Sequence, residues 1–294
     1  MAALGLSDED PRIVGEHVVA AWDHFLELAE AADLDRPSRL PGWSGKAVAI
    51  HLGSWAERTP LTGLLESARN GGAGETPDLD AENAALVAAH RDATRDEVLA
   101  ALIRARDTIE EFFDGPLPEE LGRQPARSSL GPLPVLSLVH ASTYELAVHA
   151  LDLAPCGAPT PPAHLLDRGL AALLDVTGAL AARIGIHASV TAQAGEGGWS
   201  FASDADGWVT TPARPGFDGA GVRGAAADLL DASAGRAALP QLLLTRRLVV
   251  HNMTSFMRLA PLVHEVPGLP GGAALKTGVA GLGKVTGLVG RLRR

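Results

Sequence analysis

The sequence predicts a mainly α-helical protein, in which an N-terminal helical bundle precedes a smaller α+β domain. Apolar residues recur three and four positions apart through most of the first 185 residues, which is the period of an amphipathic helix. After Gly185 the pattern changes to short segments in which apolar and polar residues alternate, as they do in strands. With 294 residues, of which 46% are hydrophobic, the chain can bury a substantial core.

Helical segments are expected at residues 11–32, 46–69, 80–113, 135–153 and 163–184. Ser44 can cap the second segment, and Pro60 should kink or interrupt it. The third should break just before Thr94, because Thr94 and Glu97 have the spacing of a capping box. Residues 115–134 hold several prolines and glycines and are expected to form a long loop. With no strand expected before residue 185, these segments predict an up-down bundle with long connections.

The C-terminal part combines short strands with helices. Strands are expected at residues 187–194, 199–201 and 208–210, and helices at residues 224–235 and 239–262. We therefore divide the chain into a helical bundle at residues 1–185, a small α+β domain at residues 186–264 and a basic, glycine-rich tail at residues 265–294.

Composition excludes several classes of protein. The net charge of -10 argues against a general nucleic-acid binder. Cys156 is the only cysteine, which excludes an intramolecular disulfide framework and a metal site made of cysteines alone. No run of 18 apolar residues predicts a membrane span, and the first residues are too acidic for a secretory signal. A cytoplasmic protein is therefore expected.

The tail has a charge pattern of its own. Apolar residues recur near helical spacing between basic residues, which is a pattern found on anionic membrane surfaces. Repeated glycines weaken such a helix by about 1 kcal/mol each relative to alanine. The sequence therefore favours a flexible, solvated tail over contact with a membrane.

One helix carries a carboxylate and an imidazole on the same face. Glu145 and His149 stand four residues apart, so both can point at one metal ion. Two residues do not make a metal site, and a solvated hydrogen-bonded pair would have the same spacing. Asp152 shares this face and could orient His149 or meet a substrate, although it could equally be a residue on the bundle rim. His140 lies about half a turn away and is a poorer candidate.

A third ligand must come from another helix, and His51 is the best candidate. It lies among apolar residues that should face the bundle core, where a histidine can also be purely structural. Two histidines and one glutamate with an open fourth position suit a catalytic divalent metal, zinc above all.

Two segments resemble a known family. The sequence from Leu40 to Leu52, Leu-Pro-Gly-Trp-Ser-Gly-Lys-Ala-Val-Ala-Ile-His-Leu, resembles a motif of the mycothiol-dependent maleylpyruvate isomerases and the wider DinB/YfiT-like metalloproteins. The acidic residue usual before the histidine is replaced here, at Lys46 or Ala47. Residues 144–153 resemble the family's second motif, a Glu-x-x-x-His-x-x-Asp helix. The resemblance covers residues 10–155 well, and the smaller domain more loosely.

The resemblance implies a DinB-like four-helix bundle in which His51, Glu145 and His149 bind one divalent metal, usually zinc. It also implies mycothiol, a low-molecular-weight thiol of actinobacteria, as the cosubstrate. A thiol bound at the open metal position loses its proton, and its thiolate can attack a small electrophile. The implied activity is that of a mycothiol-dependent thiol transferase or isomerase, for which no protein cysteine is needed.

Arg236 matches a Gly-Arg step of the family's smaller domain and is the candidate for holding a substrate carboxylate. Arg223 competes with it, and either could be an ordinary surface arginine. Two alternatives to the main reading stay open. A protein of this fold can be a metal-dependent hydrolase, or a non-catalytic protein that binds a metal or another ligand. The expected partners are a small electrophile and a thiol, with no nucleic acid.

Overall fold

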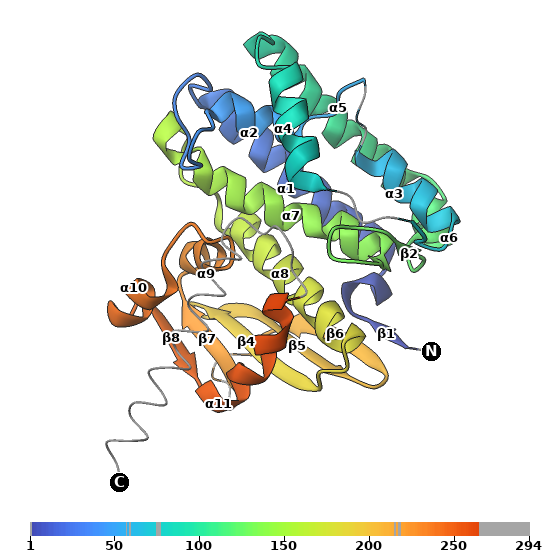
Figure 1. The fold of residues 1–294 in the computed structure, drawn as a ribbon, viewed down its shortest axis with the longest axis vertical. Coiled ribbons are helices and arrows are strands. Elements are labelled where there is room, and N and C mark those ends of the chain that lie inside the picture. The colour runs from blue at the N-terminus through green and yellow to red at the C-terminus, as the bar shows by residue number, and fades with distance from the viewer. Residues whose placement is uncertain are drawn as a thin grey trace.

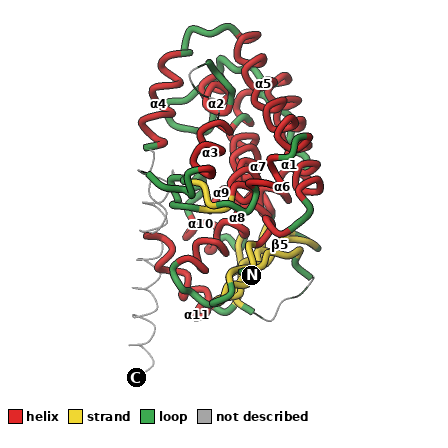
Figure 2. The backbone as a smooth tube through the Cα atoms, turned by 90° about the vertical axis from the view of Figure 1, so that its right-hand side faces the viewer, coloured by secondary structure: helices red, strands yellow, loops and turns green. Residues whose placement is uncertain are grey.

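The computed structural model describes residues 2–264, apart from residues 57, 59, 75–77, 215, 217 and 218. A layer of helices lies against a mixed β-sheet, and α8 (Ala163–Arg183) runs between the two (Figure 1). Figure 2 shows the same arrangement from the side, with α1 to α7 above the larger sheet and α11 at its lower end. The predicted mainly α fold with a smaller α+β part is thus confirmed, while the tail from residue 265 lies outside the described residues.

The bundle has a core formed by long amphipathic helices. They are α1 (Pro11–Ala31), α2 (Gly45–Leu52), α3 (Pro60–Arg69), α4 (Leu79–Ala89), α5 (Arg95–Asp114) and α7 (Val135–Asp152). Fully buried side chains from four of them, Phe25, Ile50, Leu102 and Leu146, belong to one core. The Ser44 hydroxyl accepts a hydrogen bond from the Ala47 amide at the start of α2, and Thr94 and Glu97 form the predicted capping box.

One expectation for this part is confirmed in part and another is wrong. The segment at residues 46–69 is interrupted, and its second helix starts at Pro60, but the first helix already ends at Leu52 because the chain becomes extended at Gly53. The expected loop at residues 115–134 contains α6 (Leu117–Leu121) and two short antiparallel strands, β2 (Pro125–Ala126) and β3 (Leu133–Pro134). Strands therefore do occur before residue 185, although they are only two residues long.

The larger sheet has the strand order β1-β6-β5-β4-β7-β8. Its members are β1 (Ala3–Leu4), β4 (Ala188–Ala194), β5 (Gly197–Asp204), β6 (Gly207–Pro212), β7 (Ala220–Gly224) and β8 (Leu248–His251). Strands β4, β5 and β6 pair antiparallel, whereas β7 runs parallel to β4 and β1 runs parallel to β6. Phe201 and Trp208 pack on α8 at Gly178, where an added Cβ would lie 2.9 Å from the Trp208 ring. The glycine therefore allows helix and sheet to approach closely.

The last predicted helix, at residues 239–262, is also wrong. The chain forms α9 (Ala226–Ser233) as expected, but then α10 (Leu239–Leu244), β8, α11 (Met253–Phe256) and the 3-10 helix η3 (Met257–His264). Arg246 and Asn252 adopt positive φ angles of 56° and 49°, which interrupt helical structure on either side of β8. The segment between them gains hydrogen bonds by pairing with β7, and β7 itself was not predicted.

A buried carboxylate connects the N-terminal segment, the bundle and the sheet. Asp175 on α8 accepts hydrogen bonds from the Leu6 amide at 2.9 Å, Trp208 Nε1 at 2.9 Å, Thr210 Oγ1 at 2.8 Å and Ser137 Oγ at 3.0 Å. Its burial raises the pKa of the carboxyl group above its ordinary value. Because these partners come from both parts of the chain, the boundary at residue 185 stays a prediction. Within the described residues, no helix is both long and apolar enough to cross a bilayer.

Candidate metal centre

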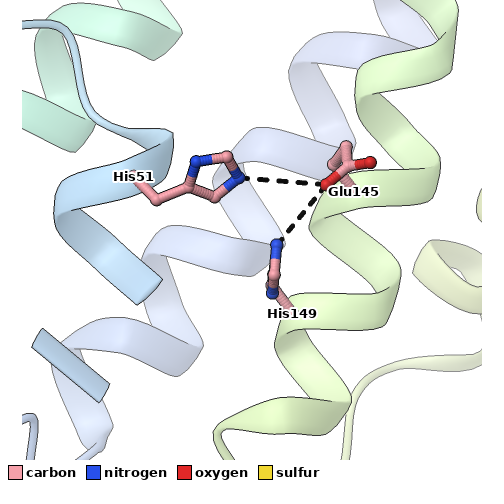
Figure 3. Close-up of side chains that lie close together, drawn as sticks. All are labelled: His51, Glu145 and His149. Atoms are coloured by element: carbon pink, nitrogen blue, oxygen red, sulfur yellow. Dashed lines mark ion pairs between the residues drawn. The ribbon is translucent and has the colours of Figure 1, made fainter. Parts of the chain in front are cut away.

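Helices α2 and α7 bring His51, Glu145 and His149 together (Figure 3). His51 Nε2 lies 3.9 Å from Glu145 Oε2, and His149 Nε2 lies 3.4 Å from the same oxygen. One ligand atom from each residue falls within 4.8 Å of the others, and no other group of described residues has this arrangement. The structure thus places the three residues that the sequence singles out around one point.

Local structure holds these side chains. Ser44 starts α2, which puts His51 in the last turn of that helix. The Trp43 ring meets the His51 ring edge-on with 5.7 Å between ring centres, so the Pro-Gly-Trp segment fixes one side of the imidazole. On α7, Glu145 and His149 are one turn apart and face the same way. The His51 and His149 rings are 5.2 Å apart.

The donor set fits zinc. Two imidazole nitrogens and one carboxylate oxygen are ordinary zinc ligands, and tetrahedral ligands about 2.0–2.1 Å from zinc lie about 3.3 Å apart. The observed separations of 3.4 and 3.9 Å are close to this value. The Glu145 side chain is 49% exposed whereas that of His149 is only 7% exposed. The centre therefore opens to solvent on the Glu145 side, where a fourth ligand could enter.

A second carboxylate orients His149 from behind. His149 Nδ1 lies 3.1 Å from Asp152 Oδ2, and Asp152 is completely buried. With Nδ1 donating this bond, the Nε2 lone pair is left for a metal, which is the usual relation between a metal-bound histidine and a carboxylate. His51 differs, because its buried Nδ1 has no hydrogen-bond partner among the described residues. On the Nδ1 side, packing holds that imidazole and no hydrogen bond contributes.

Asp152 is in turn held by two arginines. Arg236 donates from Nε to Asp152 Oδ1 at 3.0 Å and from Nη2 to Oδ2 at 3.0 Å. Arg39 Nε lies 3.5 Å from Asp152 Oδ1, and the Arg39 guanidinium makes two hydrogen bonds to Asp231 on α9. Two arginines and two aspartates cancel in charge, so a compact ionic network connects the centre to the smaller domain.

The protonation states suit metal binding. Burial would raise the pKa of Glu145, but hydrogen bonds with His149 and His51 outweigh it and hold the pKa well below its ordinary value. Burial lowers the pKa of His51, which leaves a neutral imidazole at pH 7. For His149, burial is outweighed by Asp152 and Glu145, and its pKa rises to about 8. A metal must therefore displace a proton from His149 at neutral pH.

Of the other candidates from the sequence, the structure places only Arg236 beside the metal centre. Arg236 faces Asp152 and is 9% exposed, whereas Arg223 lies on β7 and donates from Nε to Gln193 at 3.0 Å. His140 is buried elsewhere on α7, near Arg168. From the sequence alone, no role is assigned to Arg39. Its position directly before the Leu-Pro-Gly-Trp motif is the one sequence signal that places it near the site.

Tyr144 and Cys156 complete the description. Tyr144 Oη lies 3.1 Å from Ser233 Oγ, so the residue beside Glu145 contacts α9 of the smaller domain. Burial raises the pKa of the Tyr144 phenol. Cys156 Sγ is buried against the carbonyl oxygen of Arg36, and burial raises the pKa of this thiol too. The only cysteine of the chain is therefore in a structural position.

Comparisons with known proteins identify a domain family and a similar fold. Residues 16–154 match the family model of the mycothiol maleylpyruvate isomerase N-terminal domain. In a search of curated proteins, no sequence matches the chain. Two solved structures are similar in fold: the crystal structure of the mycothiol-dependent maleylpyruvate isomerase and that of its histidine-to-alanine mutant. Each has a TM-score of 0.51 and 16% sequence identity, over 80% of this chain and 93% of the other. Residues 16–154 of the chain are therefore identified with one domain family, the mycothiol maleylpyruvate isomerase N-terminal domain.

Proposed function

We propose that the protein binds one zinc ion, or a similar divalent metal, at His51, Glu145 and His149 and catalyses a mycothiol-dependent isomerisation or thiol transfer on a small electrophile. The observation that carries the proposal is the convergence of both histidine Nε2 atoms on one oxygen of a half-exposed Glu145. This arrangement leaves room for a ligand from solvent.

The metal supplies one property: it lowers the pKa of a coordinated thiol, so that a thiolate forms at neutral pH. The protein residues supply the rest. Asp152 holds His149 in the tautomer that presents Nε2, and the exposed side of Glu145 leaves an entrance. The only cysteine is buried and its pKa is raised, so it makes a poor nucleophile, and a thiol from solution is required.

Asp152 and Arg236 have distinct parts in this proposal. Asp152 acts through His149 and is a positioning residue. Arg236 stays the candidate for binding a substrate carboxylate. It lies close to the metal centre, because it binds the same Asp152 carboxylate that contacts His149. Its Nε and Nη2 already donate to Asp152, and Nη1 donates to the Ala234 carbonyl at 3.2 Å. A substrate carboxylate would use the N–H groups that these acceptors leave.

The proposal also gives the protein a setting. Mycothiol is made by actinobacteria and acts inside the cell, so a cytoplasmic actinobacterial enzyme is the setting that we propose. Experiment must identify the electrophile. The structural neighbours are named maleylpyruvate isomerases, so maleylpyruvate is one of the electrophiles to test.

The test is metal analysis of the purified protein followed by assays with and without thiol. We expect about one zinc per chain and turnover of an electrophile that requires mycothiol. His51→Ala should lose both, whereas His187→Ala, which changes an exposed histidine, should lose neither. Turnover of an ester or amide without thiol would instead favour the hydrolase, and metal without any turnover would favour a binding protein.

A further inference from the structure

Three histidines outside the metal centre meet between α1 and α8. The His17 and His164 rings are 5.8 Å apart with an interplanar angle of 67°, and the His24 and His164 rings are 5.9 Å apart at 87°. His17 and His24 lie two turns apart on the same face of α1, and His164 is in the first turn of α8. His164 therefore contacts both of the other imidazoles.

The geometry resembles that of two histidines that share a metal. With metal–nitrogen bonds of about 2.0–2.1 Å, the ring centres of two such imidazoles lie about 5–6 Å apart. His51 and His149 provide a measure within the same molecule, since their rings are 5.2 Å apart at 76°. The two pairs at His164 come close to this arrangement, and small side-chain rotations would bring their nitrogens onto one ion.

The histidines are accessible and suitably protonated. His164 is exposed and the His24 side chain is 30% exposed, so an ion can reach both from solvent. Burial, together with the charge of Arg168, lowers the pKa of His17 and that of His164. The neutral form of His17 and of His164 is therefore favoured, and a metal needs the neutral form.

The surrounding charges favour a cation over an anion. Arg168 is the neighbouring cation, and its charge is offset by Asp167, which lies 3.0 Å from Nη2. Two more carboxylates adjoin the histidines: Glu16 acts on His17, and Glu27 Oε2 lies 3.8 Å from His24 Nδ1. These groups together carry more negative than positive charge, although Arg168 is the charged neighbour with the largest effect on His17 and His164.

We propose that His164, with His17 or His24, forms a second metal site that takes a late first-row divalent ion such as copper, nickel or zinc. Imidazole is a preferred ligand of these ions, and copper should bind most tightly of the three. In the described residues, three ligand atoms come within 4.8 Å only at the first centre, so the second site has two imidazoles. Water completes its coordination.

The experiment counts metal ions on the full chain. Zinc-loaded protein is titrated with Cu²⁺, and electron paramagnetic resonance detects nitrogen coupling from the bound copper. The same titration on His149→Ala, which lacks a ligand of the first centre, separates the two sites. In His149→Ala we expect one equivalent of copper with two nitrogen ligands. In the zinc-loaded parent we expect the same equivalent in addition to the metal ion at the first centre, so this result does not depend on the function proposed above.

Substitutions then identify the ligands. His164→Asn should lower the copper affinity of the second site at least about tenfold. Removing a residue that only hydrogen-bonds to a metal ligand already lowers metal affinity by about this factor, and His164 is itself a ligand. The double variant His17→Asn/His24→Asn should lose as much copper affinity as His164→Asn. Each single variant keeps one pair of histidines and should lose less affinity. His187→Asn, at an exposed histidine on a different part of the chain, should bind as the parent does. A total of one metal ion per chain in the copper-titrated parent, or an unaltered copper affinity of the second site in His164→Asn, would overturn the proposal.

Discussion

Arg236 and Asp152 form a two-pronged ion pair directly behind the imidazole of His149. The guanidinium donates to both carboxylate oxygens at 3.0 Å, and His149 Nδ1 lies 3.1 Å from one of these same oxygens. The arginine comes from the smaller domain and the histidine from the bundle, so the smaller domain acts on the metal centre through a single shared carboxylate.

Asp152→Asn should lower zinc affinity about 10- to 100-fold, because a neutral amide is a weaker partner for His149 than a carboxylate. Competition with a chelator of known affinity measures the change. The variant also leaves Arg236 buried without its counter-ion, which can destabilise the fold by about 3–5 kcal/mol. The double variant Asp152→Asn/Arg236→Gln should recover stability and still bind zinc weakly. Parental affinity in the double variant would show that Asp152 does not support His149.

His149→Ala should lose most of the bound zinc, because only two ligands would remain. His140→Ala is the matched control on the same helix, since His140 is buried but lies outside the ligand group. It should keep about one zinc per chain while losing stability. Metal analysis of both purified variants gives the answer, and full zinc occupancy in His149→Ala would refute the ligand set.

Arg236→Ala should reduce turnover of a carboxylate-bearing electrophile about 10- to 100-fold, which corresponds to losing a charge-assisted hydrogen bond. The zinc content should stay near one per chain, because all three ligands remain. An uncharged electrophile of similar size should be affected much less. If both substrates slow equally, Arg236 acts only by holding Asp152.

Because of His140, the free energy of unfolding should decrease as the pH is lowered below about 6.5. Burial lowers the pKa of His140 to about 3, and its neighbours His17 and Arg168 add to this effect. Between pH 6.5 and 3 the unfolded chain therefore takes up a proton that the folded protein does not. The free energy of unfolding should drop by about 1.4 kcal/mol per pH unit in this window and be unaffected by His140 above it.

Urea unfolding of the metal-free protein at pH 7 and pH 5 measures this dependence. His140→Leu removes the titrating group, and the difference between parent and variant should shrink by about 2 kcal/mol on going from pH 7 to pH 5. A constant difference between the two proteins would mean that His140 does not contribute to the pH dependence.

Asp175→Ala should destabilise the protein by about 2–6 kcal/mol, because the Leu6 amide and Trp208 Nε1 would each lose a buried acceptor. Asp175→Asn keeps one acceptor oxygen in place and should cost clearly less. Thermal unfolding of both variants compares them. Equal losses would indicate that packing, and not hydrogen bonding, makes this position important.

The bundle and its metal ligands were accessible to sequence reasoning for a physical reason. Helical periodicity, the Ser44 cap and the capping box at Thr94 are local signals, and the spacing of Glu145 and His149 is local as well. The likeness to known motifs added His51. Little tertiary information was needed for any of these.

What was missed depends on contacts between distant segments. Strand β8 lies within a segment whose apolar spacing resembles that of a helix. Its pairing with β7 and the positive φ angles at Arg246 and Asn252 make it a strand. The same holds for Arg39, which reaches Asp231 almost two hundred positions away. No local pattern in the sequence announces such a partner.

Strand β1 has a consequence for how this architecture can change. The first strand of the chain is an edge strand of a sheet whose other strands lie beyond residue 187 (Figure 1). The Leu6 amide, which follows this strand, donates a hydrogen bond to Asp175. A single recombination crossover between bundle and sheet would therefore exchange the edge strand together with the bundle. The bundle and the sheet can therefore be recombined with other partners only if the new N-terminal segment contains an equivalent edge strand.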